Sequence, residues 1–152
     1  MNIVFERAEK EDISQLIKVQ KLSFREEFIQ HGECLPYNEK AKDMEHLIEN
    51  HIVYKIIINE EIIGDMVIII KSKNFYYLKI IAVIPSYQNL GIGKKAIDFM
   101  EKDNPNATLW RLITSKDNKK NCHFYESMGY KNVREIIRKE SFDLVNYEKI
   151  KD

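Results

Sequence analysis

The stretch IPSYQNLGIGKKAIDF, residues 84–99, determines how the rest of the chain is interpreted. A β-like run, FYYLKIIAVIP, leads into it, and an amphipathic helical pattern leaves it. Gly91 and Gly93, two of only five glycines in the chain, stand between them and are followed at once by Lys94 and Lys95. Glycines let an anion approach the backbone, and the first N–H groups of a helix point at it. The stretch therefore predicts a phosphate-binding loop.

The composition predicts one globular domain spanning residues 1–152. The chain is 44% hydrophobic and 32% charged. Lys and Arg together number 24, as do Asp and Glu, so no net field attracts nucleic acid or an anionic membrane. We therefore expect neither nucleic acid nor a membrane as a partner. The N-terminal MNIVFERAEKED lacks a signal peptide's apolar stretch, and the longest apolar runs have the length of strands.

The cysteines and histidines point away from metal binding. Cys34 and Cys122 lie far apart and match no zinc spacing, which predicts reduced thiols in a cytoplasmic protein. The histidines likewise show no metal-ligand spacing, so no metal is expected; they are His31, His46, His51 and His123.

Hydrophobic periodicity predicts a mixed α/β or α+β fold with a mostly antiparallel sheet of about seven strands and about four helices. The expected order is β-α-α-β-β-β-α-β-α-β-β. Helices are expected at 12–24, with Asp12 as N-cap, from about Asn38, after Gly91 and over 115–129; the stretch 25–40 suggests a loop or broken helix. Strands are expected at 2–7, 51–59, 61–70, 75–84, 108–114, 130–139 and 141–150.

The letters of the glycine loop alone leave several interpretations open. GIGKKA fits a dinucleotide fingerprint, but PSYQNL separates its first glycine from the strand, and an antiparallel meander precedes it. A P-loop would need a GxxxxGK(S/T) spacing, which this stretch lacks. An ordinary strand-to-helix turn with solvated lysines also fits.

The longer string LKIIAVIPSYQNLGIGKKAIDFME resembles the acyl-CoA-binding motif of the GNAT superfamily of N-acetyltransferases, in which a strand precedes (Q/R)-x-x-G-x-(G/A) and a helix. Gln88, Gly91 and Gly93 match that motif. Downstream, Asn118, Tyr125 and the pair Gly129-Tyr130 resemble the family's N-x-x-A-x-x-(L)-Y-x-x-x-G-(F/Y) segment. The resemblance covers nearly the whole chain, and it is strong from Leu78 to Tyr130. It implies a GNAT fold and acetyl-CoA as acyl donor.

The resemblance also implies roles for individual residues. Backbone N–H groups from Gln88 to Lys94 would bind the pyrophosphate of CoA, and Asn118 would contact CoA. A backbone N–H from Ile81 to Val83 would polarise the acetyl carbonyl. Tyr125 would protonate the departing thiolate, and its phenol has a suitable pKa of about 10. The implied acyl-CoA-binding residues are Ile81, Ala82, Val83, Gln88, Asn89, Leu90, Gly91, Ile92, Gly93, Lys94, Asn118 and Tyr125.

Two departures from the family pattern matter. Asn121 stands where the family has a small residue, which should be tolerated if the position faces outward. The strand before the loop carries Lys79 and no carboxylate, so the general base is unassigned among His31, Glu33, Asp65, a water chain and deprotonation before binding.

We expect an acetyl-CoA-dependent N-acetyltransferase, monomeric or homodimeric, acting on a primary amine of a small molecule or peptide. A non-catalytic acyl-CoA-binding sensor or partner module is the alternative.

Overall fold

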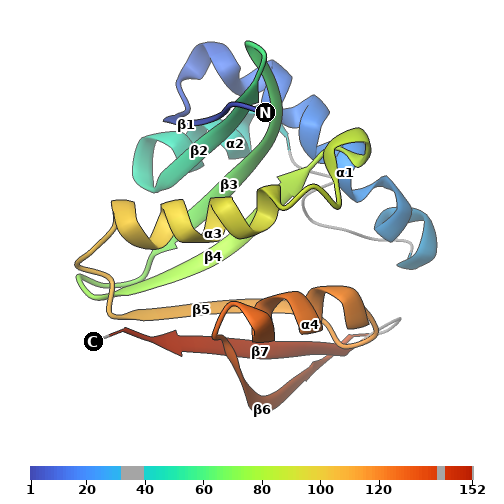
Figure 1. The fold of residues 1–152 in the computed structure, drawn as a ribbon, viewed down its shortest axis with the longest axis vertical. Coiled ribbons are helices and arrows are strands. Elements are labelled where there is room, and N and C mark those ends of the chain that lie inside the picture. The colour runs from blue at the N-terminus through green and yellow to red at the C-terminus, as the bar shows by residue number, and fades with distance from the viewer. Residues whose placement is uncertain (32–39, 140–142, 152) are drawn as a thin grey trace.

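A computed structural model describes residues 1–31, 40–139 and 143–151, apart from the side chains of residues 26–28, 30 and 31. The described residues form a seven-stranded sheet and four α-helices in the order expected from the sequence (Figure 1). The elements are β1 (Ile3–Arg7), α1 (Ile13–His31), α2 (Ala41–Asn50), β2 (Ile52–Ile58), β3 (Glu61–Ile70), β4 (Phe75–Val83), α3 (Ile92–Asp103), β5 (Leu109–Ser115), α4 (Lys119–Ser127), β6 (Lys131–Arg138) and β7 (Asp143–Ile150).

The sheet divides into two arms that separate between β4 and β5. Its strand order is β1-β2-β3-β4-β5-β7-β6, antiparallel throughout except for the parallel β4–β5 pair. Pairing joins Phe75–Leu78 to Leu109–Leu112, and beyond Leu78 the two strands diverge (Figure 1). We call β1–β4 with α1, α2 and α3 the N-terminal arm, and β5–β7 with α4 the C-terminal arm. The predicted meander of β2, β3 and β4 is confirmed.

A hydrophobic core lies on each face of the sheet. On one face α3 and α4 cover the sheet, and Trp110, Ile97 and Met100 are fully buried there. On the other face α1 and α2 pack on β2–β4 through Leu16, Met44 and residues of the strands. The described helices include none long and apolar enough to cross a membrane.

The predicted end of the first helix at Phe24 is wrong, because α1 continues to His31. The mixture of charged and aromatic residues after Phe24 suggests a loop or broken helix, but Arg and Glu are good helix formers and no glycine or proline stands before Gly32. Residues 32–39, including Cys34, Glu33 and the predicted second helix start at Asn38, lie outside the described residues; α2 begins at Ala41.

Two other local predictions need correction. Asp12 does not begin the first helix: it closes a 3-10 turn over Lys10–Asp12, and its carboxylate accepts from the Glu9 N–H at 2.8 Å. Ser115 is the last residue of β5 and not the start of a helix, since α4 begins at Lys119. Gly129 does end α4 with a left-handed backbone, φ +92°, as expected.

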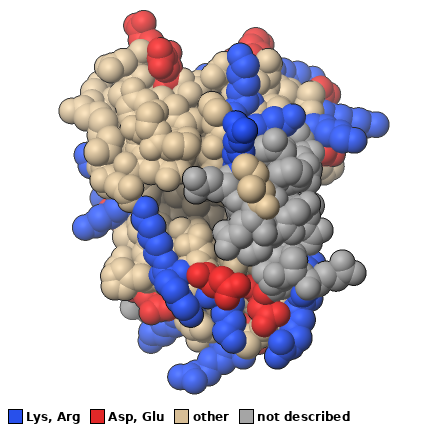
Figure 2. All heavy atoms as spheres, turned by 90° about the vertical axis from the view of Figure 1, so that its right-hand side faces the viewer, with Lys and Arg blue, Asp and Glu red and all other residues tan. Residues whose placement is uncertain are grey.

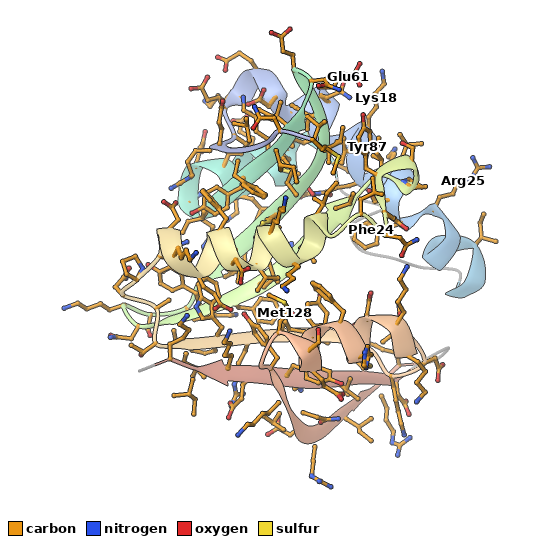
Figure 3. All side chains as sticks on the ribbon, in the orientation of Figure 1. Lys18, Phe24, Arg25, Glu61, Tyr87 and Met128 are labelled. Carbon is orange, nitrogen blue, oxygen red and sulfur yellow. The ribbon has the colours of Figure 1, made fainter. Side chains whose placement is uncertain are left out.

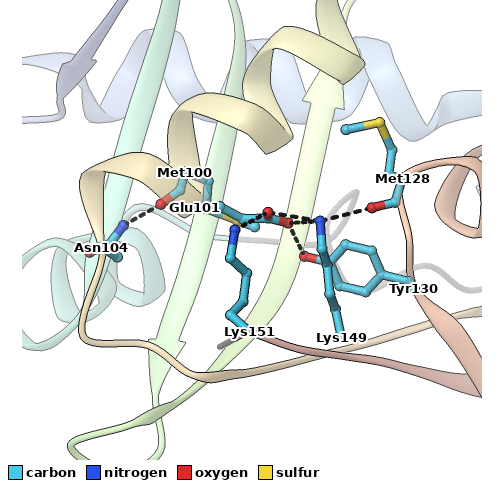
Figure 4. A network of polar contacts seen from close by, with 7 residues as sticks. All are labelled: Met100, Glu101, Asn104, Met128, Tyr130, Lys149 and Lys151. Atoms are coloured by element: carbon cyan, nitrogen blue, oxygen red, sulfur yellow. Dashed lines mark hydrogen bonds and ion pairs between the residues drawn. The ribbon is translucent and has the colours of Figure 1, made fainter.

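A charge network around the buried carboxylate of Glu101 fixes the two arms to each other where they are paired (Figure 4). Glu101 of α3 accepts from Lys149 at 2.9 Å and Lys151 at 3.1 Å, and from the Tyr130 hydroxyl at 3.0 Å. Lys149 also donates to the Met128 carbonyl at 2.9 Å. A carboxylate with several donors is satisfied despite its burial. The network therefore holds α3 of one arm against β7 of the other.

Candidate active site

A cavity of about 930 Å³ opens between the separated arms. Both arms contribute to its lining: β4, the loop after it and the first turn of α3 on one side, and the end of β5 with α4 on the other. Figure 2 looks at this side of the molecule and shows a hollow at its centre with lysine or arginine side chains beside it. Among the lining residues, Figure 3 labels Phe24 and Tyr87 of the N-terminal arm and Met128 of the C-terminal arm.

The loop from β4 to α3 has a backbone that depends on glycine. A 3-10 turn over Pro85–Tyr87 follows the strand, and Gln88 then donates through its Nε2 to the Val83 carbonyl at 2.8 Å. Asn89 and Gly91 take left-handed conformations with φ of 64° and 79°. Gly91 is the N-cap of α3, so the first N–H groups of the helix begin at the cavity wall. This is the arrangement that favours an anion.

Gly93 has a second structural role that the motif did not reveal. A Cβ built at this position would lie 3.2 Å from Cζ of Phe124 on α4. Glycine here therefore lets the first turn of α3 approach the opposite arm. The approach of a phosphate to Gly93 stays a prediction.

The edge of β4 that faces the cavity presents alternate backbone groups. The Ile84 N–H donates to the Ile63 carbonyl of β3 at 2.9 Å, so it points away from the cavity. Backbone N–H groups point alternately to the two sides of an extended strand. The N–H of Ala82 therefore also points to β3, and the N–H groups of Ile81 and Val83 point to the open edge. Of the three residues expected to offer a backbone donor, Ile81 and Val83 are thus placed to do so and Ala82 is not.

Tyr125 lies in the cavity wall and is 7% exposed. The rings of Phe124, Tyr130 and Tyr147 surround it, with centroids 5.2, 6.2 and 6.3 Å from its own. Burial raises the pKa of the Tyr125 phenol well above its ordinary value, with smaller contributions from Tyr77 and Cys122. The hydroxyl therefore remains protonated at any physiological pH.

The start of α4 forms the opposite rim of the cavity. Asn118 caps the helix, and its Oδ1 accepts from the Asn121 N–H at 3.0 Å. Asn121 is exposed at the rim, so the helix accommodates it in place of the small residue of the motif. Lys120 reaches across to donate to Oδ1 of Asn89 in the loop of the other arm.

The structure brings nearly all the predicted binding residues to this one cavity. Leu90 is half exposed and is not among the described lining residues. Those that do line the cavity are Ile81, Ala82, Val83, Gln88, Asn89, Gly91, Ile92, Gly93, Lys94, Asn118 and Tyr125. Their roles toward a ligand stay predictions.

Ser115 is a cavity residue that the sequence analysis missed. It is buried at the end of β5, and its hydroxyl has no hydrogen-bond partner among the described residues. The predicted helix over 115–129 includes this residue, whereas the structure places it at the end of a strand.

The candidate bases can be placed in part. The side chain of His31 and all of Glu33 lie outside the described residues. Asp65 is fully buried on β3 and accepts from Gln20 Nε2 at 2.7 Å. Cys122 is a free thiol whose Sγ contacts the Ser115 carbonyl. Among the described residues, no three His, Cys, Asp or Glu side chains gather as a metal site.

Solved acetyltransferases share this fold. The PaiA N-acetyltransferase from Thermoplasma acidophilum, in complex with coenzyme A, superposes with a TM-score of 0.83, 19% identity and coverage of 99% of both chains. The ribosomal-protein-S18-alanine N-acetyltransferase from Escherichia coli superposes with a TM-score of 0.83 at 16% identity, covering 99% of this chain and 96% of the other. A GNAT family acetyltransferase from Elizabethkingia anophelis with acetyl-CoA bound gives 0.66 at 17% identity, covering 98% of both.

Sequence comparison supplies the family. The uncharacterized protein YrkN of Bacillus subtilis is 33% identical over 75 residues, which span 49% of this chain and 40% of YrkN. A sequence model of the acetyltransferase (GNAT) family matches residues 16–130, which include the glycine loop, β4 and Tyr125. The chain therefore belongs to the GNAT family of acetyltransferases.

Proposed function

We propose that this protein transfers the acetyl group of acetyl-CoA to a primary amine. One observation carries the proposal: a single cavity is lined by the glycine loop, by β4 at its open edge and by Tyr125. Coenzyme A and acetyl-CoA are the ligands of the Thermoplasma and Elizabethkingia structures, and the two arms here diverge in the same fold.

In the proposed complex the pyrophosphate lies at the start of α3. N–H groups of residues 89–94 donate to it, and the left-handed backbone at Gly91 directs them. The expected N–H of Gln88 is not among them, because it donates to the Pro85 carbonyl at 3.2 Å. The Lys94 side chain also lines the cavity, and its charge is secondary to the backbone.

The pantetheine extends along β4, where Ile81 and Val83 offer N–H groups. Asn118 can donate through Nδ2, since its Oδ1 is used by the helix cap. Ser115 offers its buried hydroxyl to the same ligand.

The chemical step needs a polarised carbonyl and a proton for sulfur. A backbone N–H of Ile81 or Val83 stabilises the negative charge that develops on the carbonyl oxygen. The amine nitrogen bonds to the carbonyl carbon, the C–S bond breaks, and its electron pair leaves with sulfur. Tyr125 gives its proton to the thiolate and is reprotonated from solvent, while the nitrogen releases a proton to a base.

An amine-dependent thiol-release assay tests this function. The acceptors are tyramine, spermidine, lysine amide and a hexapeptide with a free α-amino group. The proposal expects release of CoA above the rate without amine for at least one of them, together with an acetylated product by mass spectrometry.

The absence of a carboxylate from residues 75–83 favours the alternative of a non-catalytic acyl-CoA sensor. That alternative would be established if acetyl-CoA stabilises the protein against heat but no amine of the panel raises the release of CoA.

A further inference from the structure

The described lining of the cavity carries more positive than negative charge. Its charged side chains are those of Lys94 on α3, Lys119 and Lys120 on α4, and Asp117 just before α4. No ion pair joins any of the four to another described residue. An excess of unpaired ammonium groups around a hollow attracts an anionic ligand.

The two lysines of α4 stand where they do not help the helix. Lys119 and Lys120 belong to its first turn, which contains no acidic residue. The N-terminal end of a helix dipole is positive, so cations there are unfavourable to the helix itself. Both residues are exposed, so packing does not require them either. A ligand therefore explains their place better than the stability of α4 does.

The side chain of Lys120 reaches from one arm to the other. Its Nζ donates to Oδ1 of Asn89, and because both residues are exposed, this contact lies at the mouth of the cavity. Asn89 has a left-handed backbone two residues before Gly91, the N-cap of α3. The Lys120 ammonium therefore lies beside the loop that leads into α3. Two of its three donors have no partner among the described residues.

Lys120 lies far from the group proposed to serve the sulfur. It stands in the first turn of α4 and Tyr125 in the second half, about 8 Å further along the helix axis. The start of α3, next to Asn89, is where the pyrophosphate is proposed to bind. Lys120 thus lies at the phosphate end of the proposed CoA site. CoA has a further phosphate at this end, on the 3′-hydroxyl of its ribose.

We infer that Lys120 is a ligand for a phosphate group of CoA, contributed by the arm opposite the glycine loop. The inference rests on the proposed function for the identity of the ligand. When CoA is bound, the ammonium donates to a phosphate oxygen, which is a stronger acceptor than the neutral amide oxygen of Asn89. The phosphate then replaces the direct contact between Lys120 and Asn89 as the link between the two arms at the mouth of the cavity.

Lys120→Met tests the inference, because it removes the ammonium and keeps an unbranched side chain. Calorimetric titration without any amine gives the Kd of CoA and that of dephospho-CoA, which lacks the 3′-phosphate. We expect the Kd of CoA to rise about fivefold, since a hydrogen bond between two charged groups is lost. An equal rise for dephospho-CoA would identify the pyrophosphate as the partner, and an unchanged Kd for dephospho-CoA would identify the 3′-phosphate. Lys120→Arg should keep the Kd of CoA within about twofold of the wild type, because a guanidinium also binds phosphate.

Lys95→Met is the matched control. Lys95 is likewise exposed and follows Lys94 at the start of α3, but it is not among the described lining residues. The Kd of CoA for Lys95→Met should stay close to that of the wild type. An unchanged Kd in Lys120→Met, or an equal rise in both variants, would overturn the inference, and amine-dependent release by the wild type would still support the proposed function. Failure of the wild type to bind CoA would overturn both.

Discussion

The two walls of the cavity differ in what they contribute. The N-terminal arm presents backbone: N–H groups of the loop and of β4, with Gln88 holding the Val83 carbonyl. The C-terminal arm presents side chains: Tyr125, Asn118 and Ser115. A backbone-built surface tolerates changes of side chain except where glycine sets the conformation, whereas a side-chain-built surface is lost with a single substitution. Among single substitutions, the loss of turnover should therefore be largest at Tyr125 of the C-terminal arm, and the loss of acyl-CoA affinity should be largest at the glycine loop of the N-terminal arm.

The largest effect is expected on the C-terminal arm, from Tyr125→Phe. Removal of a general acid lowers turnover by about 100-fold or more. The acetyl-CoA KM should change by less than about threefold, because the backbone surface is untouched. Steady-state kinetics with a panel amine measure both.

Tyr147→Phe is the matched control for that variant. Tyr147 is buried against Tyr125, donates to Glu126 at 2.7 Å, and is not among the described lining residues of the cavity. The kcat of Tyr147→Phe should stay close to that of the wild type. An unchanged kcat in Tyr125→Phe would show that Tyr125 does not protonate the thiolate.

On the N-terminal arm the sensitive position is Gly91. An added Cβ would meet no atom within 4 Å, so Gly91→Ala tests the backbone conformation at this position without introducing a steric clash. At φ of 79° an L-residue costs about 1–2 kcal/mol, and relief of that strain would turn the N–H groups away from the phosphate. We expect the acetyl-CoA KM to rise about tenfold with kcat nearly unchanged.

Gly129→Ala separates strain from binding. Gly129 has a similar backbone, φ of 92°, at the end of α4, and is not itself among the described lining residues of the cavity; a Cβ there would lie 3.4 Å from Cε of Lys149, an ordinary contact. Both substitutions should lower the melting temperature by a similar amount, but only Gly91→Ala should weaken the binding of acetyl-CoA. Equal acetyl-CoA KM values in the two variants would contradict the assignment of the loop to the phosphate.

The sequence predicted the N-terminal wall better than the rest of the site, for a physical reason. Gln88 and Gly91 act through local backbone geometry, so their spacing is visible in a short string, whereas the contact of Gly93 with Phe124 of the other arm is not. The divergence of β4 and β5 depends on where their pairing ends at Leu78 and Leu112, which only the packing of the whole sheet decides.

Contacts between distant segments were likewise not predictable. Gln20 and Asp65 are 45 residues apart, and nothing in either local pattern indicates the other. The predicted helix over 115–129 includes Ser115, which lies on β5, and the mixture of charged and aromatic residues after Phe24 predicts too short an α1. Helix propensity alone would have extended it.

A smaller effect is expected from Ser115→Ala. A buried hydroxyl without a partner among the described residues does not stabilise the fold, so its removal should leave the melting temperature equal or slightly raised. Loss of one hydrogen bond to the ligand should raise the acetyl-CoA KM about threefold. Calorimetric titration with acetyl-CoA and a thermal melt measure the two quantities. A lower melting temperature with unchanged affinity would show that Ser115 serves the fold and not the ligand.

The smallest effect is expected from alkaline pH on the C-terminal arm. Tyr125 acts as an acid, so its contribution is complete below its pKa and is lost as the pH rises through it. Burial raises that pKa above the ordinary value of about 10. The kcat at saturating acetyl-CoA and amine should therefore show no falling limb between pH 7 and about 10, whatever rising limb the amine produces. A falling limb in this range that Tyr125→Phe abolishes would mean that the phenol is solvated during turnover, and that the C-terminal wall opens more than the described structure does.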